Sequence, residues 1–583
     1  MLNLNKTLTT KHSLLGETTF YLKTRWFVLR RTCDNLFANP QKFHGDDTFQ
    51  GQSIIATSES ELWNSDDNEH NWTLTAGKVQ NLRLATRKLN GIIVPPNQVF
   101  SFWKHIGNPN FGNRFVVGRE VREGCIVATK AGGLCQLSNA LYDAALKAGF
   151  EIIERHRHTK VIKGSLAESD RDATIKWNYV DLRFRSPRPF KIEIDITTDK
   201  LLVRFLGTPV TGEIPGAASG ALLKPSTLND CYSCGNVACF KHRYIPVGER
   251  IKSVTTFILD AKWLEYDEYI KSISTENDFF IVPVRQSNFV KINNYNWAVK
   301  NQLNVRSTPT EAIMRAIIMR VNRKSENIFS LVLRTDKKIA KALARKIPIE
   351  STHLVVSQNL LPFLWEDGVF GGRTFDVLMT RLPMQHLHER LDFAYSRYPE
   401  SKTLNDFRAS RALIDVENRA LTNSRHIITP HQEVANIFNN KSVKLNWVLP
   451  NNAEPGALKG REILFPAAGL GRKGAYEIKQ LATELKLRLK IAGNRTEFSE
   501  FWNGLDIEIA DGNVFNNVGL VIYPTYVEHR PGLLLKAIAG GIPVITTTAS
   551  GILPGENITI VPVGNYEALR EAAILALEKL GNK

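Results

Sequence analysis

EILFPAAGLGRKGAYEIKQLATELKLRLKIAG, residues 462–493, consists of a buried-type strand, a glycine-rich loop, a helical stretch and a second buried-type strand. The alternation continues through GLVIYP (519–524) and IPVITT (542–547), with another helical stretch between them. Short apolar runs separated by helices are typical of strands covered on both faces. The pattern therefore predicts a parallel α/β sheet. DFFIVPV (278–284) and HLVVS (353–357) extend the same architecture upstream.

The loop that joins the first strand to its helix carries three glycines in the order G-x-G-x-x-G: Gly469, Gly471 and Gly474. Arg472 and Lys473 lie between them, and two cations at a helix N-terminus are suited to neutralise a diphosphate. A dinucleotide site would also require an acidic residue at the end of the next strand. That strand, residues 487–493, is followed by asparagine and arginine. The loop therefore predicts a phosphate site and argues against NAD.

The segment GLVIYPTYVEHRPGLLLKAIAGGIPVITT (519–547) resembles the donor-binding motif of retaining GT-B glycosyltransferases. In that family a loop glutamate and the following helix hold the sugar and the phosphates. The resemblance implies this role for Glu528, with Arg472 and Lys473 as the phosphate clamp. The family has a second glutamate eight residues further on, where this chain has Lys536. The departure implies altered donor recognition, with Lys536 contacting phosphate, or lost activity.

A cysteine lies at the start of a helix in AGGLCQLSNALYDAALKAGFEIIERHRHTK (131–160). The apolar face of that helix consists of Leu137, Ala140, Leu141, Ala144, Ala145 and Ala148. The positive end of the helix dipole favours a thiolate at Cys135. Two histidines and two aspartates follow in the sequence: His156, His158, Asp170 and Asp172. We take Cys135 and His156 as a candidate catalytic pair; the alternative is a cysteine that only packs the helix.

The segments around this helix resemble the VanW family over about residues 20–207. The resemblance rests on PPNQVFSFWKHIGNP (95–109), on the cysteine segment itself and on DATIKWNYVDLRF (172–184). Many members have three glycines where this chain has AGGLCQ. The family implies an association with the cell envelope and with glycopeptide resistance, but no agreed activity. Strand candidates in residues 173–205 predict an α+β domain, whereas the polar stretch 40–70 predicts a loop.

A second cysteine cluster follows a linker rich in glycine, proline and alanine at residues 208–226. Its potential ligands are Cys231, Cys234, Cys239 and His242, spaced C-x2-C-x4-C-x2-H. Four such ligands within twelve residues suit a structural, tetrahedral zinc site. An iron–sulfur cluster and incidental thiols are the alternatives.

The net charge of +17 favours an anionic partner, such as a nucleotide, a phosphate or an anionic lipid surface. No long Lys/Arg block occurs, so nucleic acid is not expected. Residues 19–36 mix aromatic and cationic side chains and predict a helix that packs on its own domain or, alternatively, lies on an anionic membrane surface. Without an apolar signal core or a disulfide framework, we expect a cytoplasmic protein, with the inner face of the membrane as the alternative location.

Together these features predict a multi-domain protein. We expect an α+β VanW-like domain over 1–207, a linker with the Cys/His cluster over 208–245, and GT-B-like twin Rossmann α/β domains over 246–450 (acceptor) and 451–583 (nucleotide sugar). The resemblances imply a retaining hexosyltransferase that takes a sugar from a nucleotide-diphosphate donor and needs no metal. The expected acceptor is a glycan or a lipid-linked molecule of the cell envelope or of secondary metabolism. The alternatives are a non-catalytic envelope or glycopeptide-resistance protein that binds a glycan or nucleotide, and a thiol-dependent hydrolase centred on Cys135.

Overall fold

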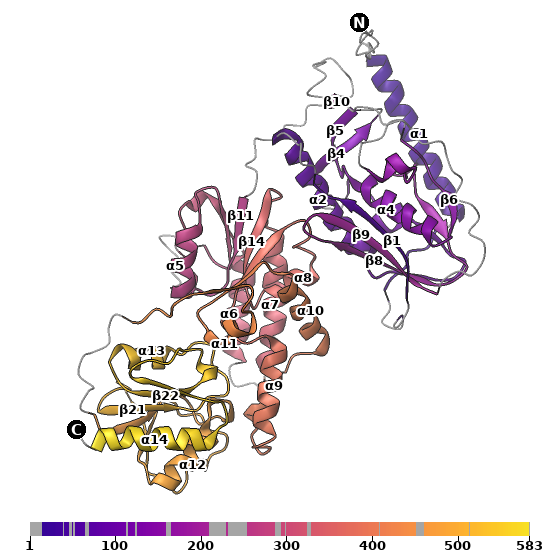
Figure 1. Ribbon diagram of the computed structural model, residues 1–583. Helices are drawn as coiled ribbons and strands as arrows, with labels where there is room; N and C mark the ends of the chain where they lie inside the picture. Colours follow the sequence, from indigo (N-terminus) through magenta and orange to yellow (C-terminus); the bar gives the residue numbers. More distant parts are fainter. Residues whose placement is uncertain are drawn as a thin grey trace. The chain divides into compact units, whose positions relative to one another are not determined.

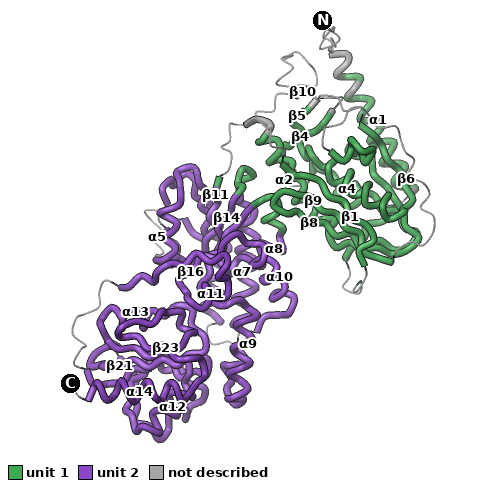
Figure 2. The backbone as a smooth tube through the Cα atoms, in the orientation of Figure 1, with its two compact units in different colours: residues 1–254, 348–352, 368–373 green, residues 255–347, 353–367, 374–583 purple. Residues whose placement is uncertain are grey.

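The structure, a computed structural model of the chain, describes residues 14–38, 40–45, 49, 53–63, 69–111, 115–122, 125–158, 165–208, 229–230, 254–285, 293–297, 299–322, 328–406, 408–450, 460–511 and 513–581. Figure 1 shows the order of its elements. The chain divides into two compact units (Figure 2). The first contains residues 1–254, 348–352 and 368–373, and the second contains residues 255–347, 353–367 and 374–583.

The first unit contains three small sheets and four α-helices among its described residues. The largest sheet is antiparallel, in the order β1 (Ser53–Glu61), β9 (Lys200–Gly207), β8 (Phe190–Ile196) and β2 (Ile93–Val94). The second, also antiparallel, has the order β3 (Val99–Ser101), β7 (Arg183–Arg185) and β6 (Glu151–Glu154). In the third, β4 (Val117–Arg122) pairs antiparallel with β5 (Cys125–Lys130), and β10 (Asn229–Asp230) runs parallel to β5. The helices are α1 (Leu14–Ala38), α2 (Glu69–Leu89), α3 (Phe102–Ile106) and α4 (Leu134–Lys147).

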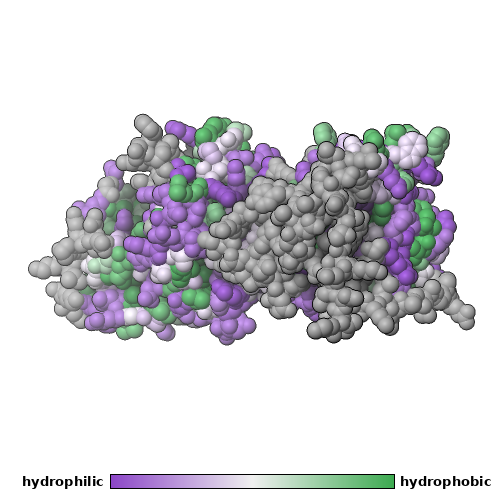
Figure 3. All heavy atoms as spheres, turned by 90° about the horizontal axis from the view of Figure 1, so that it is seen from above, coloured by the Kyte–Doolittle hydropathy of each residue, from purple (hydrophilic) through white to green (hydrophobic). Residues whose placement is uncertain are grey.

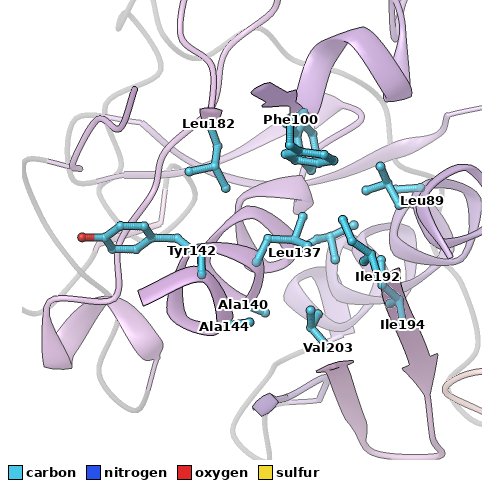
Figure 4. Close-up of a cluster of buried hydrophobic side chains, with 14 of the residues drawn as sticks. Leu89, Phe100, Leu137, Ala140, Tyr142, Ala144, Leu182, Ile192, Ile194 and Val203 are labelled. Carbon is cyan, nitrogen blue, oxygen red and sulfur yellow. The ribbon is translucent and has the colours of Figure 1, made fainter. Parts of the chain in front are cut away.

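The core of the first unit lies between α4 and the largest sheet. Every second residue of β8 and β9 is buried over most of their length, as expected for strands with one face on a core. Figure 4 shows Leu137, Ala140 and Ala144 of α4 close to Ile192 and Val203 of this sheet. The apolar spacing that predicts this helix therefore also identifies the face that it buries.

Two expectations for the first unit are wrong in detail. Residues 53–61, within the stretch expected to be a loop, form β1 and pair antiparallel with β9. The sequence SIIATSESE is polar because this strand lies at the edge of its sheet and buries few side chains. Most of residues 173–182 is not a strand, and only Lys176 and Val180 form an isolated bridge there. The turn between them interrupts the alternation that suggested a strand.

Helix α1 packs on the first unit through one face. Arg31 donates to both carboxylate oxygens of Glu154, at 2.5 and 2.8 Å, and the Phe27 ring stacks on Tyr179 with centroids 5.7 Å apart. Several apolar side chains elsewhere on the helix are exposed: Leu22, Trp26, Leu29, Leu36 and Phe37. Figure 3 shows other hydrophobic side chains, in green, that reach the surface between hydrophilic ones. The expected contact of this helix with its own domain therefore involves only part of its surface.

The second unit contains two sheets. The first has seven strands in the order β13 (Val305–Ser307), β12 (Phe279–Val282), β11 (Val254–Ile258), β14 (Ser351–Ser357), β15 (Thr374–Leu378), β16 (His426–Thr429) and β17 (Ser442–Lys444). Its helices are α5 (Leu264–Ile273), α6 (Pro309–Val321), α7 (Ile328–Ala344), α8 (Leu361–Glu366), α9 (Met384–Tyr395), α10 (Arg411–Asn423) and α11 (Gln432–Ile437). The strand pairs with a described register are parallel.

The second sheet of this unit has six parallel strands. Their order is β20 (Ile507–Ile509), β19 (Leu489–Ile491), β18 (Glu462–Phe465), β21 (Val518–Tyr523), β22 (Val544–Thr547) and β23 (Ile558–Val561). Its helices are α12 (Ala475–Leu485), α13 (Gly532–Ala539) and α14 (Tyr566–Gly581), and α14 contacts three of the strands. All six residues of β21 are buried, as the uninterrupted apolar run predicts for a central parallel strand.

The predicted fold class is confirmed: an antiparallel α+β region precedes two parallel α/β sheets. The exact domain limits at residues 207, 245 and 450 remain predictions. Within the residues that the structure describes, no helix is both long and apolar enough to cross a membrane.

Candidate functional site

The candidate site lies where the strand order of the six-stranded sheet reverses. After β18 the chain adds β19 and β20 on one side, and β21 then returns to pair with β18 on the other side. The loops after β18 and β21 therefore leave neighbouring strand ends in opposite directions. In open α/β sheets such a switch point, at the carboxyl ends of the strands, is where ligands bind.

An ion pair joins these two loops. Lys473, in the loop after β18, donates to Glu528 Oε2 at 2.9 Å and to the Val527 carbonyl at 3.1 Å in the loop after β21. Both side chains are largely buried. Two of the three ammonium hydrogens of Lys473 are thus committed within the protein. The structure brings together two residues that the sequence places 55 positions apart.

The Glu528 carboxylate accepts four hydrogen bonds. Oε2 accepts from Lys473 and, at 2.5 Å, from the Tyr523 hydroxyl. Oε1 accepts from the backbone amides of His529 and Arg530, at 2.8 and 2.9 Å. Burial opposes ionisation, but these donors outweigh it and lower the pKa of Glu528. The carboxylate is therefore ionised at neutral pH, and in this structure it holds the lysine and its own loop in place.

The other two predicted cations differ in their surroundings. The Arg472 side chain is mostly buried, and Nη1 lies 3.4 Å from the Asp406 carboxylate. Burial lowers the pKa of Arg472, and the Asp406 carboxylate opposes this shift. Lys536 is exposed in the last turn of α13. Arg472 thus lies next to the Lys473–Glu528 pair in sequence and structure, whereas Lys536 points into solvent.

The three loop glycines are explained by close packing within the protein. A Cβ on Gly469 would lie 2.8 Å from the Trp502 ring, and one on Gly471 would lie 2.5 Å from Ser401 Oγ. Gly474 has φ of +82°, and its Cβ would lie 2.1 Å from the Pro524 carbonyl oxygen. A side chain at any of the three positions would collide with the protein itself. Their expected role in phosphate binding remains a prediction.

One backbone amide of the loop, which would be expected to donate to a phosphate, already donates to a carboxylate of the protein. The Gly471 amide donates to Glu497 Oε1 at 2.6 Å. The same carboxylate accepts from Ser401 Oγ at 2.9 Å and from the hydroxyl of Thr403. Phosphate contacts at this loop would therefore come from side chains rather than from the Gly471 amide.

A second polar cluster lies at the corresponding switch point of the seven-stranded sheet, between β11 and β14. Arg315 of α6 donates to both oxygens of Asp260, at 2.5 and 2.9 Å, and to Asp336 of α7 at 3.0 Å. Asn359, after β14, donates to Asp260 at 2.6 Å. Burial and the neighbouring Asp260 raise the pKa of Asp336 to about 6. Sequence reasoning missed this cluster, although Asp260 directly follows an apolar strand.

Two histidines lie near the Lys473–Glu528 ion pair, and sequence reasoning did not identify either of them. His431, after β16, has Nε2 at 3.2 Å from the Glu528 carbonyl oxygen. Desolvation and the Lys473 ammonium lower the pKa of His529 to about 3, and burial also lowers the pKa of His431. Both rings are neutral at pH 7, so neither adds to the positive charge of Arg472 and Lys473.

The remaining predicted site residues belong to the first part of the chain, before the second unit. Cys135 is half-buried at the second position of α4. His156 lies 3.3 Å from Glu154, with 47% of its side chain exposed, whereas the neighbouring His158 hydrogen-bonds Asp172, and the Cys135 sulfur helps to raise the pKa of His158. The predicted metal ligands Cys231, Cys234, Cys239 and His242 lie outside the described residues. Among the residues that are described, no group of three or more His, Cys, Asp or Glu is arranged to hold a metal ion.

Comparison with known proteins confirms the resemblance of the front region. Residues 77–206 match the family described as VanW like protein. The vancomycin B-type resistance protein VanW of Enterococcus faecalis is 33% identical over 126 residues, which cover 21% of this chain and 46% of that protein. The uncharacterized protein YoaR of Bacillus subtilis is 29% identical over 106 residues, which cover 18% of this chain and 34% of that protein. The chain thus spans less than half the length of these relatives.

Two solved structures align with part of this chain. A sucrose-phosphate synthase from Thermosynechococcus elongatus aligns over 57% of this chain and 91% of that chain, at 14% identity and a TM-score of 0.35. The lipopolysaccharide outer core galactosyltransferase WaaB aligns over 56% of this chain and 90% of that chain, at 10% identity and a TM-score of 0.34. The order of parallel strands in the two sheets is the evidence for twin α/β architecture in this protein.

Proposed function

We propose that the second unit is a glycosyltransferase whose donor, a nucleotide-diphosphate sugar, binds at the loops after β18 and β21. The observation that carries this proposal is the Lys473–Glu528 ion pair at the switch point of the six-stranded sheet. In this proposal Arg472 and Lys473 contact the diphosphate, because fixed cations stabilise the charge that develops on a departing nucleoside diphosphate. No divalent metal is required for this stabilisation.

In this proposal Glu528 orients Lys473 and the loop that precedes α13. Its four hydrogen bonds leave little capacity for a new partner, so a sugar hydroxyl would reach it only by displacing one of them. Glu528→Gln removes the charge that fixes Lys473 while keeping the shape. Lys473 would keep its charge for the diphosphate but lose its fixed position, so we expect this variant to lose turnover, which depends on that position, more than nucleotide affinity. Retention of configuration at the anomeric carbon would be read from the product by NMR.

The acceptor is proposed to be a glycan or lipid-linked glycan of the cell envelope. Support comes from the front region, which is similar to an enterococcal vancomycin resistance protein. A non-catalytic domain that binds a nucleotide or glycan is the second candidate. Lys536, where the glycosyltransferase motif has a glutamate, and the carboxylate already bound to the Gly471 amide favour it.

The donor site is tested by calorimetry with uridine, guanosine, adenosine and thymidine diphosphates and their glucose conjugates. Loss of one charge-assisted contact costs about 1.5–3 kcal/mol, so Arg472→Ala should weaken binding roughly ten- to hundredfold. Arg488→Ala is the matched control, because Arg488 is exposed and lies just before β19, at the amino ends of the strands, whereas the donor loops lie at the carboxyl ends. It should leave the affinity unchanged. Equal effects of the two substitutions would place the nucleotide elsewhere, and no binding to the unmodified protein at millimolar ligand would reject the donor site.

A further inference from the structure

The start of α4 in the first unit is held in a tightly packed turn. Ala131 and Gly133 both have positive φ, at +61° and +99°. A Cβ on Gly133 would lie 2.1 Å from the side chain of Lys78, and one on Gly132 would lie 2.3 Å from the Gly118 carbonyl oxygen. The backbone around Cys135, the second residue of the helix, therefore has little freedom to move. Its thiol is presented at the positive end of a 14-residue helix.

A histidine and a buried aspartate lie near this thiol. Asp172 is fully buried, and its Oδ1 lies 2.7 Å from His158 Nδ1. Its Oδ2 accepts the His158 backbone amide at 2.5 Å. An ionised carboxylate only accepts hydrogen bonds, so Nδ1 carries the proton and Nε2 is the nitrogen directed to other partners. His158 lies close enough to Cys135 for the sulfur to raise the pKa of its imidazole.

Side chains of α4 also hold the segment that contains Asp172. Asn139 Oδ1 accepts the Ala173 amide at 2.8 Å, and Ser138 Oγ donates to the Ala173 carbonyl at 2.5 Å. The Cys135 Sγ atom lies 3.8 Å from Thr174 Oγ1. The helix that carries the cysteine thus positions the aspartate that orients the histidine.

The charge of His158 is set by its two neighbours, Asp172 and Cys135. Burial by itself would lower the pKa of His158, but the Asp172 carboxylate and the Cys135 sulfur outweigh it and raise the pKa to about 10. The imidazole is therefore protonated at neutral pH. An imidazolium next to a thiol at a helix N-terminus stabilises the thiolate, which is the nucleophilic form.

We propose that Cys135, His158 and Asp172 form a nucleophilic site for acyl transfer from amide or ester substrates. Cys135 and His158 are the catalytic residues, and Asp172 is a positioning residue. This site is independent of the proposed donor site in the second unit. It makes His158, rather than His156, the partner of the thiol.

The reaction requires no oxidant or cofactor. The Cys135 thiolate attacks the substrate carbonyl carbon, a C–S bond forms, and the carbonyl oxygen takes up negative charge facing the amides at the start of α4. Collapse of this intermediate breaks the C–N or C–O bond, and the leaving amine or alcohol takes the proton from His158 Nε2. Water or an amine then attacks the thioester carbonyl carbon and gives a proton to His158. The C–S bond breaks, which releases the carboxylic acid or new amide and restores the Cys135 thiolate.

The first test is alkylation by iodoacetamide at neutral pH, with each cysteine followed separately by peptide mass spectrometry. Cys135 should react about tenfold or more faster than Cys33, which is exposed on α1. His158→Ala should remove this advantage. His156→Ala is the matched control and should leave the rate unchanged, because His156 is paired with Glu154. If His158→Ala does not fold, His158→Asn keeps a donor for Asp172 without the positive charge.

The second test supplies an acyl group. p-Nitrophenyl acetate and p-nitroacetanilide present the same acyl group as an ester and as an amide, and acetylated Cys135 should be detected with at least one of them. A Cys135 that alkylates no faster than Cys33, or an equal effect of His156→Ala and His158→Ala, would overturn the triad. A fast thiol that forms no thioester with either probe would overturn the acyl-transfer assignment.

Discussion

At the scale of single residues, Gly474 shows how the donor loop depends on backbone conformation. Its φ of +82° lies in the region that favours glycine, and the absent Cβ makes room for the Pro524 carbonyl oxygen. This contact brings the loop after β18 against the loop after β21. The approach of these loops, which places Lys473 beside Glu528, therefore depends on a residue without a side chain.

We expect Gly474→Ala to destabilise the six-stranded sheet by about 2 kcal/mol or more, because backbone strain and a steric clash add. Hydrogen exchange of peptides from β18 and β21 measures the local free energy of opening. Gly532→Ala is the control, because a Cβ there meets nothing within 4 Å at the start of α13. That change should be neutral or stabilise by up to about 1 kcal/mol. Similar losses for both variants would contradict the role of the Gly474–Pro524 contact.

At the scale of elements, α1 has two different faces. One packs on the first unit through Arg31, and the other exposes an apolar stripe: Leu22, Trp26, Leu29, Cys33 and Leu36, at the spacing of one helix face. Three cationic side chains flank the stripe: Lys23, Arg25 and Arg30. Exposed apolar residues with a tryptophan and flanking cations are the features of a helix that lies on an anionic lipid surface.

We therefore expect the protein to cosediment with vesicles that contain phosphatidylglycerol, and to bind less at high salt because the cations are screened. Leu29→Ser should weaken binding by about tenfold, because the leucine would no longer insert into the lipid. Leu575→Ser is the control, since Leu575 is similarly exposed, on α14. Equal binding to pure phosphatidylcholine vesicles would rule out a contribution from the cations, and no binding at all would reject the lipid surface.

At the scale of the whole molecule, two units with separate cores share one chain. The core of the first unit is centred on α4, and the six-stranded sheet of the second unit has a core of its own. The chain passes from β9, which ends at Gly207, to β11, which begins at Val254, and the predicted metal ligands lie in this connection. A zinc ion there would form a structural clasp in the connection between the units.

Purified protein should contain about one zinc per chain, because four ligands at this spacing form a tetrahedral site. Cys234→Ser should lose the metal, whereas Cys33→Ser, outside the cluster, should retain it. Inductively coupled plasma mass spectrometry measures both variants. Iron in place of zinc would indicate the iron–sulfur alternative, and the absence of both metals from carefully prepared protein would reject the site.

Much of the fold was determined by the sequence alone, because the features that specify it are local. Uninterrupted apolar runs such as 518–523 predict buried parallel strands, and the apolar spacing of residues 137–148 predicts α4 and its buried face. The placement of the loops that carry Lys473 and Glu528 at one end of the sheet also followed from sequence, since loops after parallel strands share one edge of a sheet. The position of Cys135 at the start of a helix was also predicted, because the apolar spacing and the preceding glycines that indicate it are local features.

Only the tertiary structure decided which distant groups meet. The polar strand β1 forms because β9 offers it a partner, and its own composition does not indicate a strand. Asp172, in a segment held by side chains of α4, binds the ring of His158, whereas His156 pairs with Glu154. Glu497 binds the Gly471 amide from another part of the chain. Local periodicity is encoded within a few neighbouring residues, but these pairings depend on how separate segments pack, which no short stretch of sequence contains.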